Sequence, residues 1–185
     1  MPQRICPWWL GYLLASPLRR LMSNPDKLLS PYVREGMTIL EPGPGMGFYT
    51  LPLAQLVGPS GRVIAVDIQP KMLASLERRA AKAGVRGRVE TRIAAADSLG
   101  IADLAGKIDF TLAFAVVHEL PSVDAFFAQA AEASKPGAML LLAEPSGHVK
   151  APAFEKELQA AAAVGFVVVG RSKVSHCSAA VLKKA

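Results

Sequence analysis

One glutamate and three glycines lie close together near residue 40 and form the segment best suited to bind a ligand. The stretch ILEPGPGMGFYT covers residues 39–50 and places Glu41 two positions before Gly43, which is followed by Gly45 and Gly47. Glycines let a ligand approach the backbone without meeting a side chain, and a carboxylate favours a cationic partner. The loop follows an apolar run, so the pattern predicts a binding loop at the carboxyl end of a strand.

Two common ligands of such loops fit this sequence poorly. A nucleoside triphosphate would require a Lys-Ser/Thr pair at the start of the next helix, where this chain has Phe48 and Tyr49. A dinucleotide would require a third glycine that allows close helix packing, and bulky Phe48 occupies that position. S-adenosylmethionine remains, because it has no phosphate and carries an ammonium and a sulfonium charge.

Two further acids follow later apolar runs and suit the same ligand. Asp67 ends the run RVIAVD, where a carboxylate can accept hydrogen bonds from both hydroxyls of a ribose. Asp97 follows the next run and is placed to accept a hydrogen bond from an adenine amino group. The sequence therefore predicts that three acids approach one nucleoside-like ligand.

An alternation of apolar runs and helical patterns predicts the frame that positions these residues. We expect five strands with helices between them: strands at 37–41, 62–67, 88–94, 108–115 and 138–144, and helices at 48–57, 70–84, 122–134 and 151–164. Two last strands, 166–173 and 178–184, are joined by too few residues for a parallel crossover and should form an antiparallel hairpin. The expected fold is α/β: a Rossmann-like, doubly wound, mostly parallel seven-stranded sheet with that hairpin at its C-terminus, plus N-terminal helices.

Five segments, taken in order, resemble the motifs of class I S-adenosylmethionine-dependent methyltransferases. They are EPGPGMG, VIAVD, AADS, IDFTLAFAVVHEL and KPGAMLLLAEP. The resemblance covers about residues 25–185 and implies S-adenosylmethionine as the cofactor. It also implies a role for nine residues: Gly43, Gly45 and Gly47 along the methionine moiety, Glu41 towards its amino group, Asp67 on the ribose, Ile68 against the adenine, Asp97 and Ser98 at the adenine edge, and Phe114 near the transferred methyl group.

The segment after the fourth strand narrows the class of methyl acceptor. It reads FAVVHELP and does not resemble the Asn/Asp-Pro-Pro-aromatic motif of enzymes that methylate amino groups of bases or glutamine. It also lacks the cysteine nucleophile that methylation of cytosine at C5 requires. Glu144 alone cannot build a metal site of the catechol type, and Cys6 and Cys177, near opposite ends, do not match an arsenite-binding set. We expect in-line transfer to a small molecule, without a metal.

His118 and Glu144 are the candidate catalytic residues, since they follow the fourth and fifth strands. His118 has the residue type of a general base, which transfer requires only if the acceptor must lose a proton. The alternatives are that His118 packs against the cofactor or caps a turn, and that Glu144 is a solvated loop residue. The sequence leaves these alternatives open.

The net charge of +6 bears on nucleic acid as a partner. Residues 1–36 hold five basic and two acidic residues, and residues 171–185 hold four basic residues and no acidic one. Residues 37–170 hold twelve basic and thirteen acidic residues, so the excess positive charge lies at the two ends. Six basic residues cluster in the middle segment: Arg78, Arg79, Lys82, Arg86, Arg88 and Arg92. Without interleaved aromatic residues, this pattern favours a solvated helix face over a nucleic-acid patch. RNA methylation and non-catalytic cofactor binding remain the alternative functions.

The length of 185 residues predicts one domain, 1–185, with residues 1–36 as a helical extension, and the resemblance implies that it is a methyltransferase domain. The aromatic residues Trp8, Trp9, Tyr12 and Tyr32 would either form a lid over the active site or bury a helix pair on the far face. We expect no membrane insertion and, with two cysteines in no paired spacing, a cytoplasmic protein. The sequence leaves the oligomeric state open.

Overall fold

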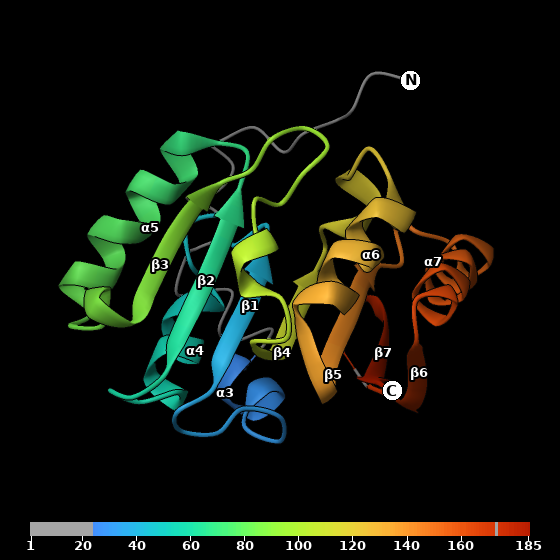
Figure 1. Ribbon diagram of the computed structural model, residues 1–185. Coiled ribbons are helices and arrows are strands. Elements are labelled where there is room, and N and C mark those ends of the chain that lie inside the picture. Colours follow the sequence, from blue (N-terminus) through green and yellow to red (C-terminus); the bar gives the residue numbers. More distant parts are fainter. Residues whose placement is uncertain (1–23, 173) are drawn as a thin grey trace.

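The computed structural model of the protein describes residues 24–172 and 174–185, and Figure 1 gives its ribbon diagram. The expectations for Trp8, Trp9 and Tyr12 therefore lie outside the described residues. The strands are β1 (Thr38–Pro42), β2 (Arg62–Asp67), β3 (Val89–Ile93), β4 (Ile108–Phe114), β5 (Ser134–Pro145), β6 (Phe166–Arg171) and β7 (Cys177–Lys184). The helices are α3 (Pro25–Leu29), α4 (Thr50–Leu56), α5 (Pro70–Lys82), α6 (Val123–Ala133) and α7 (Ala151–Ala163), with short 3₁₀ turns η1 (Arg86–Arg88), η2 (Ala102–Leu104) and η3 (Val117–Glu119).

The seven strands form one sheet in the order β3-β2-β1-β4-β5-β7-β6. The first five strands in the chain pair in parallel, whereas β7 runs antiparallel to both β5 and β6. The predicted doubly wound sheet with an antiparallel C-terminal hairpin is confirmed. The winding reverses between β1 and β4, and the crevice outside the carboxyl ends of these strands is where open α/β sheets bind ligands.

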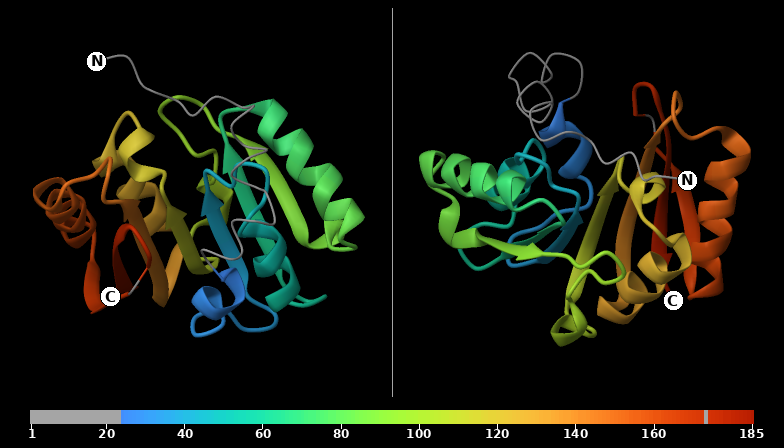
Figure 2. Two further views of the ribbon diagram at one scale, coloured as in Figure 1. Left: turned by 180° about the vertical axis from the view of Figure 1, so that it is seen from behind. Right: turned by 90° about the horizontal axis from the view of Figure 1, so that it is seen from above.

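Helices cover both faces of the sheet and define two apolar cores (Figure 2). One core joins α6 and α7 to the sheet through residues such as Phe127 and Phe154, and the other joins α3, α4 and α5 through residues such as Leu53 and Leu76. Tyr32 belongs to the second core, where its ring stacks on Phe110 of β4 with the ring centroids 5.8 Å apart. Of the aromatic residues considered for a lid, Tyr32 thus packs on the sheet.

Helix starts follow local capping chemistry. The side chains of Asn24 and Ser122 accept hydrogen bonds from the backbone amides of Lys27 and Ala125, each at 3.1 Å. The expected helix at 48–57 begins only at Thr50, because turns of the glycine loop continue through the preceding residue. No helix among residues 24–172 and 174–185 combines the length and apolarity needed to cross a bilayer.

The expected start of the fifth strand, at residue 138, was wrong, because β5 begins at Ser134 and includes Pro136 and Gly137. Ile108 of β4 pairs with Ser134 and Phe110 pairs with Met139, so the register shifts and Pro136 and Gly137 lie in a bulge. A bulge tolerates a proline, which cannot donate to the ladder. The positive φ of +80° at position 137 suits glycine.

Candidate cofactor and acceptor site

The glycine loop, residues 43–47, lies at the crevice where the winding of the sheet reverses. The amide of Gly43 donates to the carbonyl of Val66 on β2 (2.8 Å), and the Arg79 side chain of α5 donates to the carbonyl of Met46 (2.6 Å). These two bonds fix both ends of the loop to neighbouring elements. The loop is therefore a preformed part of the site.

The three glycines of the loop have different surroundings, although all have positive φ angles. A Cβ atom at Gly43 would lie 2.6 Å from Cγ2 of Val116, and one at Gly47 would lie 2.4 Å from Cδ1 of Leu76. A Cβ atom at Gly45 would meet no heavy atom within 4 Å. Gly43 and Gly47 thus allow close packing of the loop, whereas Gly45 faces open space that a ligand can fill.

Glu41 is a buried carboxyl group without a complete set of partners. Its side chain is 3% exposed, and its Oε2 atom has no hydrogen-bond partner among the described residues. Burial raises the pKa of Glu41 to about 8, and the nearby Thr50 hydroxyl opposes this rise. That hydroxyl has no hydrogen bond of regular geometry in the described structure. An unpartnered buried acid at the base of the glycine loop is suited to a hydrogen-bond donor or a cation.

The raised pKa of Glu41 predicts a distinctive pH dependence of stability. Between the ordinary glutamate pKa of 4.5 and the folded-state pKa of about 8, the folded protein binds more protons at Glu41 than the unfolded chain, so stability falls as pH rises through this window. Glu41→Gln removes this titration. We expect the difference in free energy of unfolding between the variant and the ligand-free wild type to grow by about a few kcal/mol, in favour of the variant, from pH 5 to pH 9. Urea unfolding at pH 5, 7 and 9 measures this, and a difference independent of pH would contradict it.

Asp67 ends β2 beside the glycine loop. Its Oδ1 accepts a hydrogen bond from the amide of Gln69 (2.8 Å). Burial raises the pKa of Asp67 to about 6, while hydrogen bonds from the amides of Gln69, Gly45 and Ile68 lower it. The negative charge of Glu119, on η3, raises this pKa further. Ile68 follows with its side chain 43% exposed, an apolar surface next to the acid. The structure thus brings Asp67, Ile68 and Gly45 together.

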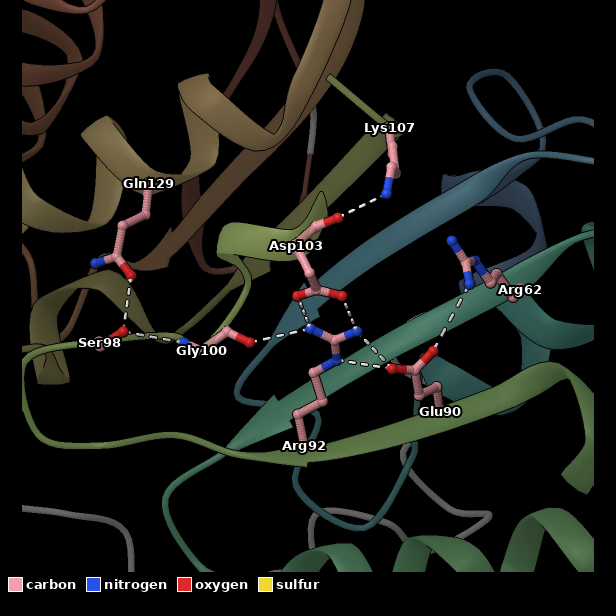
Figure 3. Close-up of polar contacts among 8 residues, drawn as sticks. All are labelled: Arg62, Glu90, Arg92, Ser98, Gly100, Asp103, Lys107 and Gln129. Carbon is pink, nitrogen blue, oxygen red and sulfur yellow. Dashed lines mark hydrogen bonds and ion pairs between the residues drawn. The ribbon is translucent and has the colours of Figure 1, made fainter. Parts of the chain in front are cut away.

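Asp97 and Ser98 are exposed at the turn that follows β3. Ser98 and Ala95 form an isolated antiparallel bridge, which makes Asp97 part of a tight turn. The Ser98 hydroxyl lies 3.4 Å from Oε1 of Gln129 on α6 and accepts from the amide of Gly100 at 3.1 Å (Figure 3). The Ser98 side chain therefore supports the turn, while Asp97 remains available to a ligand.

His118 and Glu144 are in direct contact, so the structure unites the two candidate catalytic residues. Glu144 is fully buried, accepts a hydrogen bond from the amide of Val117 (2.8 Å) and hydrogen-bonds with Nδ1 of His118. The bond to Glu144 raises the pKa of His118 above its ordinary value, against the effect of desolvation. A carboxylate on Nδ1 fixes the orientation of the imidazole and makes its Nε2 more basic. Glu144 is thus no solvated loop residue.

Phe114 is the last residue of β4, and Ala115 leads from it into the turn that carries His118. The Phe114 ring lies 4.5 Å from the ring of Tyr49, centroid to centroid, so it borders the glycine loop. Ala115 has a φ of +54°, a conformation that costs a residue with a side chain about 1–3 kcal/mol. Backbone strain of this kind concentrates at functional sites. Here the strained residue Ala115 lies three positions before His118.

Sequence reasoning missed Glu157 of α7, a second buried acid near the pair of His118 and Glu144. Its side chain is 5% exposed, and its Oε2 atom has no partner within the described residues. Burial and the charge of Glu144 raise the pKa of Glu157 to about 7, and the charge of His118 lowers it. The signal was present in the sequence, since Glu157 shares helical spacing with the buried Phe154, Leu158 and Ala161.

The basic cluster is largely occupied by contacts within the chain. Four of its six residues bind neighbouring groups: Arg79 the Met46 carbonyl, Arg88 the Ala54 carbonyl, Arg86 the carboxylate of Glu77, and Arg92 the carboxylate of Asp103. These contacts reduce the number of guanidinium groups available to phosphates.

The fold and the site together define the class I architecture of S-adenosylmethionine-dependent methyltransferases. A family model described as "Methyltransferase domain" matches residues 33–177. The chain therefore belongs to this methyltransferase family, and family membership supports S-adenosylmethionine as its cofactor.

Individual relatives agree with this family. A solved S-adenosylmethionine-dependent methyltransferase from Aquifex aeolicus superposes with a TM-score of 0.86 at 24% identity, covering 98% of this chain and 100% of that one, which bears on the fold alone. An arsenite methyltransferase of Halobacterium salinarum is 30% identical over 109 residues, 59% of this chain and 27% of that protein. A nocamycin O-methyltransferase of Saccharothrix syringae is 33% identical over 99 residues, 52% of this chain and 34% of that protein. The chain thus matches about a third or less of these curated relatives.

Proposed function

We propose that this chain transfers the methyl group of S-adenosylmethionine to a small-molecule acceptor by in-line displacement at the sulfonium methyl group. The observation that carries the proposal is the buried carboxyl of Glu41, with one unpartnered oxygen below a glycine loop that is open at Gly45. An ammonium group would satisfy that oxygen, directly or through a water molecule. The rise of the Glu41 pKa to about 8 marks how costly its charge is without such a partner.

The remaining residues fit the other parts of the cofactor. The Asp67 carboxylate has the acceptor chemistry for a ribose diol, and exposed Ile68 offers an apolar surface for the adenine. Asp97 offers acceptors to the adenine amino group, beside Ser98. When bound, the cofactor supplies a methyl group that is already activated by the sulfonium charge. The residues of this chain have to align an acceptor with that methyl group and exclude water.

His118, oriented by Glu144, serves as the general base for an acceptor that must lose a proton. Nδ1 is engaged by Glu144, so Nε2 is the nitrogen that receives the proton. The turn that carries His118 is tied to the cofactor site on two sides, since Val116 packs on Gly43 and Glu119 acts on Asp67. This placement supports a role at the methyl group rather than elsewhere on the surface.

A small molecule is favoured over RNA as the acceptor because of the basic cluster. Most of its guanidinium groups bind carbonyl or carboxylate oxygens of the chain itself. Binding to RNA should therefore be weak and fall steeply with salt, as for unspecific phosphate contacts. We place the activity in the cytoplasm, which suits a chain with only two cysteines.

Labelled S-adenosylmethionine, incubated with the protein and separated metabolite and RNA fractions of a cell extract, tests this proposal. We expect label in a small molecule, in an amount that depends on the protein. Label in RNA that persists at physiological salt would replace the small-molecule acceptor by RNA. Tight cofactor binding without label in any fraction would instead favour a non-catalytic cofactor-binding protein.

A further inference from the structure

The turn that carries Asp97 belongs to a loop, residues 94–101, which we call the Asp97 loop. An antiparallel bridge closes the turn, with the amide of Ala95 donating to the carbonyl of Ser98 at 2.9 Å. Asp97 is exposed at this turn, and its carboxylate makes no hydrogen bond within the described part of the chain. The turn alone therefore does not determine where this carboxylate lies relative to β2 and the glycine loop.

Gln129 of α6 holds the Asp97 loop from one side (Figure 3). Its Oε1 accepts a hydrogen bond from the amide of Leu99 at 2.8 Å and lies 3.4 Å from the hydroxyl of Ser98. Its Nε2 donates to the carbonyl of Ala125 one helical turn earlier, at 3.1 Å. That bond orients the amide, so that its oxygen points to the loop.

Arg92 at the end of β3 holds the same loop from the other side (Figure 3). Its Nη1 donates to the carbonyl of Gly100 at 3.0 Å, and its guanidinium binds Asp103 through both carboxylate oxygens, at 2.6 and 2.9 Å. The Nε atom donates to Glu90 at 2.7 Å, and Lys107 donates to the carbonyl of Asp103 at 2.7 Å. The guanidinium is thus fixed on three sides, and the loop is attached to it.

This arrangement affects geometry more than stability. The side chain of Asp103 is 61% exposed, whereas that of Arg92 is 19% exposed. An ion pair with one partner in solvent adds little to the free energy of unfolding. A bidentate pair nevertheless restricts orientation strongly, so its main consequence is the position of the Asp97 loop.

We propose that Arg92 and Gln129 are positioning residues that hold Asp97 where it distinguishes adenine from other purines. The inference rests on the proposed function, because it assigns the adenine of the cofactor to Asp97. Neither positioning residue needs to touch the cofactor. Each acts through the backbone of the Asp97 loop, Gln129 at Leu99 and Arg92 at Gly100.

The affinities for two compounds report on this role: the reaction product S-adenosylhomocysteine and its analogue S-inosylhomocysteine. S-adenosylhomocysteine carries an amino group on its purine, which donates to a carboxylate. S-inosylhomocysteine carries a carbonyl oxygen at that position, which a carboxylate repels. The wild-type protein should prefer the adenosyl compound by about tenfold or more, as expected for one hydrogen bond to a charged group.

Titration calorimetry of both compounds with Arg92→Gln and Gln129→Leu provides the test. Each variant should reduce the preference below about threefold, since the released loop no longer fixes Asp97. Arg86→Gln is the matched control, because Arg86 also binds a carboxylate (Glu77) and a carbonyl (Val89) but does not contact the loop. It should retain the wild-type preference. Thermal unfolding of each variant verifies that it is folded.

The outcomes separate this inference from the proposed function. An unchanged preference for the adenosyl compound in both loop variants would overturn the inference. The same holds if the affinities for both compounds fall in parallel, because a general loosening of the fold weakens the binding of both alike. Equal binding of both compounds to the wild type would overturn it as well, while leaving the cofactor assignment intact. Failure of the wild type to bind S-adenosylhomocysteine would instead refute the proposed function.

Discussion

Gly45→Val should abolish detectable binding of S-adenosylmethionine and S-adenosylhomocysteine while the protein stays folded. The side chain would enter the open space that we assign to the methionine moiety, since no heavy atom lies within 4 Å of its Cβ position. The φ of +55° makes the substitution strained, at a cost of about 1–3 kcal/mol. Calorimetric titration with both compounds, alongside a thermal unfolding curve, measures the two effects separately.

Gly84→Val is the matched control for this substitution. Gly84 follows α5, has a φ of +71° and likewise has no heavy atom within 4 Å of its Cβ position. The strain is therefore similar, but the position lies outside the site. We expect a comparable loss of stability with full cofactor affinity. If both variants bound the cofactor equally well, Gly45 would not line the methionine site.

His118→Gln should reduce the rate of methyl transfer to a protic acceptor by about 10²- to 10⁴-fold, the usual contribution of a general base. Cofactor affinity should change little, because we assign His118 to the acceptor and not to the cofactor. Added imidazole should restore part of the activity. Single-turnover transfer of labelled methyl groups measures the rate. Full activity of the variant would show that the histidine only packs in the turn.

The contact with Glu144 adds a pH signature to the same prediction. A base must be neutral, so the rate should rise with pH through the pKa of His118, which Glu144 holds above its ordinary value. Glu144→Gln should move this rising limb to lower pH, since it removes the negative charge while keeping a group that can accept from the Val117 amide. An unmoved limb would exclude His118 as the titrating base.

Local sequence patterns predicted most of the strands and helices. The strand at 62–67 agrees with β2 residue for residue, because an apolar run between a glycine turn and an acid has few alternative structures. The helix expected at 122–134 agrees with α6 to within one residue at each end, and Ser122 is its N-cap. The start of β5 was missed because the bulge at Pro136 and Gly137 depends on pairing with β4, which no local pattern contains.

The site was predictable by residue type more than by environment. Glu41 was expected as an acid near a cationic group, but its raised pKa follows from complete burial, which depends on the assembled sheet. The contact between Val116 and Gly43 and the support of the Asp97 loop by Gln129 join residues about 30 or more positions apart. Glu157 was missed, although its helical spacing with the apolar residues Phe154, Leu158 and Ala161 indicates a position on the buried face of α7.

Calorimetric titration of the purified protein with S-adenosylhomocysteine, compared with NAD under the same conditions, decides whether the glycine loop binds S-adenosylmethionine. We expect one saturable site for S-adenosylhomocysteine and no heat of binding for NAD, since bulky Phe48 occupies the position where a dinucleotide-binding loop has the glycine that allows close helix packing. Binding of NAD in preference to S-adenosylhomocysteine would contradict the assignment of Glu41, Gly45 and Asp67 to the cofactor.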